Sequence, residues 1–143
     1  MLTKTEALAK HLSDQNIFMT GDSVDDITEN DYNDSSFDYG NAEFMVYTDA
    51  EADEAVKENI RDSVWAFNPG FLASETGLDE EMFAFAAKKC EDANDAILRC
   101  IEKTCGLDSF VSDAVSSDGR GHFLSGYDGE ENEVNNYFIY RNN

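Results

Sequence analysis

The sequence is poor in basic residues. It has 10 Lys and Arg against 31 Asp and Glu, a formal net charge of −21. No Lys or Arg lies between Lys10 and Lys57, so nothing within that stretch can neutralise an acid locally. A net charge of magnitude about 2 to 8 already keeps a small domain soluble. The excess indicates a use, such as binding a basic partner, although a high-salt habitat would also produce it.

Long apolar runs and paired cysteines are lacking too. The first residues contain no apolar core of signal-peptide length, and no other run approaches the length of a membrane span. We therefore expect a soluble, cytoplasmic protein that does not bind membranes. Its three cysteines, Cys90, Cys100 and Cys105, are odd in number. We interpret them as reduced core thiols, as in a reducing compartment.

The apolar content predicts a folded chain. Hydrophobic residues make up 41% of the sequence, with ten Phe and six Tyr, too many for a disordered acidic tail. A length of 143 residues favours one domain over residues 1–143. The order of the expected elements predicts the α+β class, with a small, mainly antiparallel sheet packed against three to four helices.

Capping boxes and apolar periodicity locate the helices. Thr3 with Glu6 forms a Thr-x-x-Glu capping box, and residues 48–51 repeat it. Leu8 and Leu12 follow the first box at helical spacing and should face the core. Asn68-Pro69-Gly70 should end the second helix, and one helical turn can follow it. The predicted helices cover residues 3–15, 49–67, 79–104 and 108–115.

Alternating apolar residues and turn residues locate the strands. The clearest strands are expected at residues 43–48 and 137–141, and weaker ones at 17–20 and 122–127. Asp128-Gly129 is typical of a hairpin turn. Residues 21–41 are dense in Asp, Asn, Ser and Gly, whose side chains compete with regular structure. They should form an irregular loop that is tied down by its aromatic residues.

The acidic residues between Lys10 and Lys57 indicate a function. A folded surface of carboxylates can occupy a groove that binds phosphates, because Arg–carboxylate and Arg–phosphate pairs have similar geometry. The hypothesis is competitive inhibition of a basic nucleic-acid-binding protein, without direct binding to nucleic acid. Glu80, Glu81, Glu91, Asp92 and Asp95 would support the surface. The candidate partner-binding residues are Asp22, Asp25, Asp26, Glu29, Asp31, Asp34, Asp38, Asp49, Glu51, Asp53 and Glu54.

Simpler roles for the charged residues stay open. Acids at a helix start also stabilise the helix dipole, and a charge run is commonly only a solvated face. The acids at residues 22–34 and 128–131 do not follow the EF-hand order, so we expect no metal and no cofactor. His122 near Asp118 and Asp128 could form an acid–base pair, but no catalytic motif surrounds it, and we expect no enzyme.

Two segments carry a resemblance. Residues 63–72, SVWAFNPGFL, and residues 119–131, GRGHFLSGYDGEE, with YFIYR at 137–141, resemble small proteins encoded by bacteriophages and other mobile elements. In size and acidity the chain is also similar to antirestriction and anti-CRISPR proteins that imitate DNA. These resemblances imply a bacterial host cell as the setting and a host nuclease or defence complex as the partner.

A second hypothesis is a phage-encoded adaptor or structural protein. Such a protein would bind through exposed aromatic residues, for which Trp65, Phe71 and Tyr127 are candidates. Both a monomer and a homodimer are compatible with either hypothesis.

Overall fold

A computed structural model describes residues 1–143, which group into two compact units. Unit 1 consists of Met1–Ala55 and Arg120–Asn143, and unit 2 of Val56–Gly119. The boundary between Ala55 and Val56 falls within helix α2 (Asp49–Asp62). The expectation of one domain stays a prediction.

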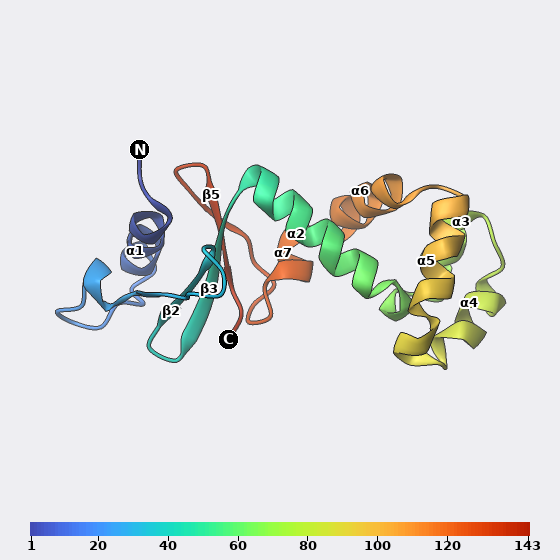
Figure 1. Ribbon diagram of the computed structural model, residues 1–143, viewed down its shortest axis with the longest axis horizontal. Coiled ribbons are helices and arrows are strands. Elements are labelled where there is room, and N and C mark those ends of the chain that lie inside the picture. The colour runs from blue at the N-terminus through green and yellow to red at the C-terminus, as the bar shows by residue number, and fades with distance from the viewer. The chain divides into compact units, whose positions relative to one another are not determined.

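Unit 1 contains the sheet (Figure 1). Its five strands follow the order β1-β2-β3-β5-β4, and every neighbouring pair is antiparallel. The predicted α+β class is therefore confirmed. The strands are β1 (Thr28–Glu29), β2 (Ser36–Tyr39), β3 (Ala42–Thr48), β4 (Asn132–Val134) and β5 (Tyr137–Arg141).

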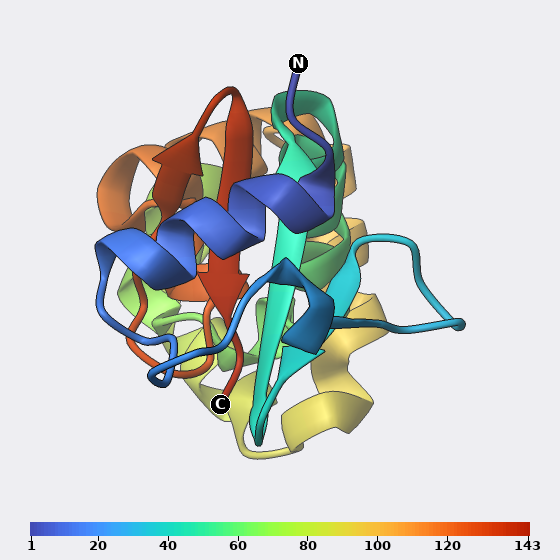
Figure 2. The same ribbon diagram turned by 90° about the vertical axis from the view of Figure 1, so that its left-hand side faces the viewer.

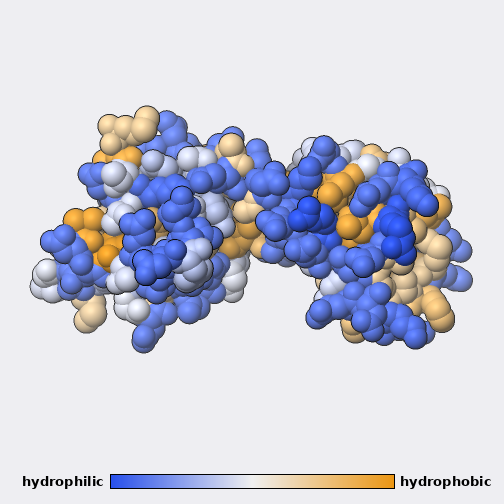
Figure 3. Space-filling view, viewed as in Figure 1, coloured by the Kyte–Doolittle hydropathy of each residue, from blue (hydrophilic) through white to orange (hydrophobic).

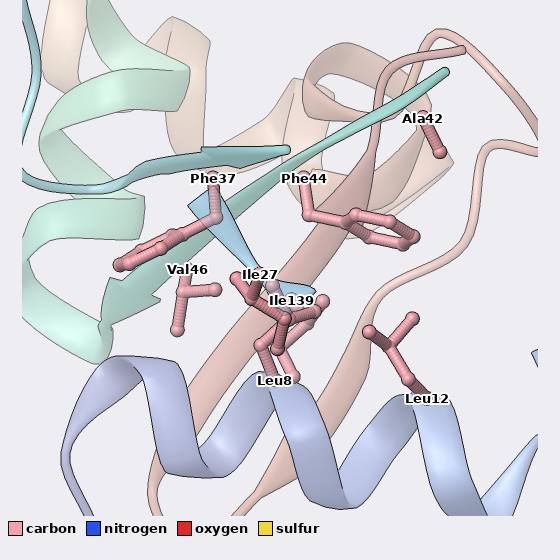
Figure 4. Close-up of a cluster of buried hydrophobic side chains, with 8 residues drawn as sticks. All are labelled: Leu8, Leu12, Ile27, Phe37, Ala42, Phe44, Val46 and Ile139. Atoms are coloured by element: carbon pink, nitrogen blue, oxygen red, sulfur yellow. The ribbon is translucent and has the colours of Figure 1, made fainter. Parts of the chain in front are cut away.

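Helix α1 (Lys4–Asp14) covers one face of this sheet. The predicted capping box is present, because the Glu6 N–H donates to Thr3 Oγ1 at 3.1 Å and the Thr3 N–H donates to Glu6 Oε1 at 3.0 Å. Figure 2 shows α1 crossing the strands. Leu8 and Leu12 are fully buried, as helical periodicity predicts, and point at the sheet residues drawn in Figure 4. Apolar burial between α1 and the sheet thus forms the core of this face.

The opposite face bears Tyr140 and Phe138, with α7 (Arg120–Leu124) beside it. Residues 122–127 were predicted as a strand, and that prediction is wrong. The strands β3 and β4 already occupy both sides of β5, so no place beside β5 is left for another strand. A Cβ at Gly121 would lie 2.7 Å from the carbonyl carbon of Glu130, so the chain approaches closely at that point. The partner of β5 is β4, and the hairpin turn is Asn135-Asn136, both with positive φ, where Asp128-Gly129 was predicted.

Two further predictions in unit 1 are corrected. Residues 17–20 form no strand, because the N–H groups of Ile17 and Phe18 donate to Leu12 O and complete the end of α1. The segment 21–41 is not wholly irregular: it contains the 3₁₀ turn Val24–Asp26 and strands β1 and β2. Phe37 on β2 is buried in the core, and this tertiary contact outweighs the turn propensity of its neighbours.

Unit 2 is helical. The C-terminal part of α2 leads to the 3₁₀ turn Val64–Ala66, so the helix ends at Asp62 and not at residue 67. Pro69 stands at the first position of the next helix, which extends the single turn that was expected. The later helices are α3 (Pro69–Thr76), α4 (Glu80–Ala87), α5 (Asn94–Lys103) and α6 (Leu107–Asp118).

The long helix predicted at 79–104 is interrupted. This interruption is one reason why the structure has seven helices where three to four were predicted. Cys90 has φ of +51° and starts the 3₁₀ turn Cys90–Ala93, so the chain leaves α4 before α5 begins. Cys90 is exposed and Cys100 and Cys105 are half-buried; all three are free thiols, but they are not core residues as predicted. No helix in the structure combines the length and apolar character that crossing a membrane requires.

Candidate functional site

The acidic loop, residues 21–41 of unit 1, is held in place by its own polar contacts. The Tyr39 hydroxyl donates to Asp22 Oδ2 at 2.5 Å and accepts the Met19 N–H at 2.8 Å. The Ser23 N–H donates to Asp26 Oδ2 at 2.8 Å, which closes a small capping box. Two of the predicted partner-binding acids, Asp22 and Asp26, therefore also shape the loop.

The other acids of the loop are free. Asp25, Glu29, Asp31 and Asp34 are exposed, and their carboxylates make no hydrogen bond or ion pair. None of the seven carboxylates between residues 21 and 41 has an ionic partner. The loop thus presents negative charge that the protein itself does not neutralise. In Figure 3, hydrophilic residues dominate the visible surface of unit 1.

The start of α2 differs from the loop. Glu51 caps the helix, because the Thr48 N–H donates to Glu51 Oε1 at 2.8 Å, and Glu51 also pairs with Lys4 at 2.8 Å. Burial alone would raise the pKa of Glu51, but the hydrogen bonds from Lys4 and Thr48 outweigh it and lower that pKa. Among the predicted acids of this helix, Glu54 alone remains without a contact, and it is exposed.

Arg120 forms ion pairs with the remaining two acids of α2. Its Nη1 lies 2.9 Å from Asp49 Oδ1 and 2.9 Å from Asp53 Oδ1, and its Nε lies 2.7 Å from Glu131 Oε1. The guanidinium also lies over the Phe138 ring, 4.6 Å from its centroid. Burial alone would lower the pKa of Arg120, but the hydrogen bonds to Glu131 and Asp49 raise it overall. The Arg120 side chain is only 11% exposed, so this cluster is a structural clamp.

Tyr140 joins the Arg120 cluster through Glu131. Its hydroxyl donates to Glu131 Oε1, the same oxygen that accepts from Arg120. Burial, and then the hydrogen bond to Glu131, raise the pKa of Tyr140.

Two acids face each other across strands β2 and β3. Asp38 is directly opposite Glu43, a like-charge pair that destabilises an antiparallel sheet. Glu43 is held by the Tyr32 hydroxyl at 2.9 Å and the Asn142 side chain at 3.0 Å, whereas Asp38 has no such partner. The strand pair therefore continues the unneutralised charge of the loop.

The supporting acids belong to the other unit. Glu80 and Glu81 lie in the first turn of α4, Glu91 and Asp92 in the following 3₁₀ turn, and Asp95 at the start of α5, all exposed. Their position at helix starts gives them a structural role through the helix dipole.

The candidate acid–base pair does not form. His122 is exposed on α7, stacks edge-on against Phe123, and makes no hydrogen bond with Asp118 or Asp128. No group of three or more His, Cys, Asp or Glu side chains lies close enough to hold a metal ion.

The aromatic candidates differ in exposure. Phe71 packs against Phe67 and Phe110, with ring centroids 5.8 and 5.4 Å away, and Trp65 is half-buried. Tyr127 is 56% exposed. The sequence interpretation missed Phe85, which is 68% exposed on α4. Phe83, two residues earlier, is buried, so residue type alone does not tell which of the two rings is exposed.

His11 is a polar residue that the sequence interpretation also missed. It lies three residues after Leu8, on the inner face of α1, and is 7% exposed. Burial lowers its pKa, although Asp128 and Asp14 partly raise it. Helical spacing could have placed it on the buried face, but not near Asp128, which is distant in sequence.

Comparison with known proteins adds no relative. No protein-family model matches the chain, and no curated protein or solved structure matches it.

Proposed function

We propose that the protein is a non-enzymatic inhibitor that imitates the charge of a nucleic-acid backbone and occupies the basic channel of a nucleic-acid-binding protein in the cytoplasm of a bacterial host cell. One observation carries the proposal: none of the seven carboxylates of the acidic loop has an ionic partner. Unit 1 holds 18 acids and four bases, and 13 of these acids lack an ion pair.

The physical reason lies in how such charges act. Unpaired carboxylates on a folded loop repel one another, and this repulsion costs stability unless a cationic surface relieves it. Arg and Lys side chains that contact phosphates can contact carboxylates in the same way. Association should be fast and sensitive to salt, because electrostatic attraction guides the encounter.

The test is affinity capture from bacterial lysate with the immobilised chain. We expect basic nucleic-acid-binding proteins to be retained and to be released by duplex DNA or by RNA. The loop variant combines Asp25→Asn, Glu29→Gln, Asp31→Asn and Asp34→Asn, and it should retain much less of these proteins than the wild type does. These four side chains make no contact that the fold requires.

The matched control removes four charges from exposed acids of unit 2 that are not among the supporting acids, with Glu58→Gln, Asp62→Asn, Glu102→Gln and Asp118→Asn. It should capture the same proteins as the wild type. Equal loss in both variants would mean that bulk charge acts, and undiminished capture by the loop variant would locate the binding surface elsewhere.

A second candidate function, an adaptor that binds through apolar residues, is favoured by the exposed side chains of α4. Phe85 and Met82 are 68% and 44% exposed, and Met82 lines an apolar cavity of about 120 Å³ between α4 and α5. Capture of partners at high salt that is lost in Phe85→Ala would support this function. Capture that high salt abolishes would contradict it.

A further inference from the structure

A polar cavity of about 310 Å³ lies in unit 1, lined by none of the residues of the acidic loop. It forms where the end of α1 meets the segment before β4 and the end of β5, and α1 crosses in front of both strands in Figure 2. Its lining includes His11, Tyr127, Asp128, Glu130 and Arg141. The volume is at the lower end of the range for small-molecule sites.

The wall of this cavity is fixed by hydrogen bonds. The Ser125 hydroxyl lies 2.7 Å from Arg141 O and 2.9 Å from Asp128 Oδ1, and the Tyr127 N–H donates to Arg141 O at 3.1 Å. A Cβ at Gly126 would lie 3.0 Å from Asn142 O, so the two segments approach closely. The Asp128 carboxylate and the backbone of Tyr127 and Arg141 are therefore held in position before any ligand arrives.

His11 is a buried polar side chain without a partner. The residue is 7% exposed, and its ring packs edge-on against Phe44 and makes no hydrogen bond within the protein. Because the ring lines the cavity, a bound molecule can supply the missing hydrogen bond.

Arg141 makes no ion pair with an Asp or Glu side chain. The other three bases of unit 1, Lys4, Lys10 and Arg120, are each in an ion pair. Arg141 donates from Nε to Asn143 O at 2.7 Å and stacks on Tyr127, 3.8 Å from the ring centroid. Its two terminal nitrogens remain available to an anionic group.

Asp128 and Glu130 provide the opposite charge in the same cavity. Asp128 Oδ1 accepts hydrogen bonds from the Ser125 hydroxyl and from the Glu130 N–H at 3.0 Å, whereas Oδ2 makes no hydrogen bond. The Glu130 side chain is exposed and unpaired. The cavity thus holds one guanidinium, two carboxylates and an imidazole without a partner.

We propose that this cavity binds a small zwitterion of the α-amino-acid type, with its carboxylate on Arg141 and its ammonium group on Asp128 and Glu130. His11 supplies a further hydrogen bond to the ligand. Nucleotides and other polyanions fit the charges poorly, because the two carboxylates outnumber the one guanidinium. A bare metal cation is disfavoured by Arg141 at the same place.

The test uses the full chain and a panel of the standard free L-amino acids at millimolar concentration, followed by NMR chemical shifts, including those of the His11 ring. At least one amino acid should bind saturably. Blocking its amine by acetylation, or its carboxylate as an amide, should each weaken binding about tenfold or more. Arg141→Gln and Asp128→Asn should do the same.

Two controls separate this site from the acidic loop. Lys10→Gln makes the same charge change as Arg141→Gln on a neighbouring element and should bind normally, as should the four-site loop variant. Absence of binding by every amino acid would overturn the proposal. Equal affinity for the blocked analogues, or for acetate or phosphate alone, would overturn it as well, and these ligand comparisons hold on the wild type even where a variant fails to fold.

Discussion

Replacing Arg120 by Gln should destabilise unit 1 by about 2 to 4 kcal/mol. The hydrogen bond to Glu131, which is 31% exposed, is of the charged kind that contributes about 1.5 to 3 kcal/mol. Asp49 and Asp53 are 70% and 67% exposed, so each of these ion pairs adds at most about 1 kcal/mol. The contact with Phe138 adds about 0.5 to 1 kcal/mol. These contributions are not fully additive, which sets the expected range.

Urea unfolding at neutral pH measures this change. Arg61→Gln is the matched control: it removes the same charge from an Arg that is 44% exposed, with carboxylate oxygens no closer than 3.7 Å. The control should change stability by less than about 0.5 kcal/mol. High salt should restore part of the loss in Arg120→Gln, because it screens the three carboxylates left behind. Equal losses in the two variants would refute the clamp and attribute the effect to net charge.

Two other substitutions test the packing and the titration of the fold. Gly121→Ala places a methyl group against Gly129 O and Glu130 and should cost about 1 to 3 kcal/mol in urea unfolding; an unchanged midpoint would contradict the close approach. Burial, and then Asp113, raise the pKa of Glu75 above its ordinary 4.5. The protonated form of Glu75 therefore adds stability below pH 4.5, and this stability is lost as the pH rises through the raised pKa. Glu75→Gln should therefore raise the free energy of unfolding by about 0.5 to 1 kcal/mol at pH 7 and leave it unchanged at pH 4. Equal effects of the substitution at the two pH values would contradict this prediction.

Local signals predicted the parts of the fold that depend on neighbouring residues. The capping boxes located the starts of α1 and α2, and alternation located β3 and β5. The errors occur where distant residues decide the structure. Residues 122–127 form no strand beside β5 because β3 and β4 occupy both of its sides, and β2 forms because Phe37 enters a core built mainly by α1 and β3.

At the candidate site, too, the sequence predicts what neighbouring residues decide and misses what distant residues decide. The absence of bases between Lys10 and Lys57 correctly indicates that the loop cannot neutralise itself locally. At α2 the same reasoning misses the cations that pair with the acids, because they are distant in sequence. Lys4 is 47 residues from Glu51, and Arg120 is 67 residues from Asp53. His11 and Asp128 likewise meet only in the folded chain. Sequence patterns therefore identify the charges, and the fold decides which of them stay free.

The measurement that tests the central claim most directly is the salt dependence of affinity for a captured partner, compared between the wild type and the four-site loop variant. The wild type should lose affinity steeply as salt rises, and the loop variant should bind more weakly with a shallower dependence. Equal affinity and equal dependence in the two proteins would contradict the claim that the acidic loop substitutes for a nucleic-acid backbone.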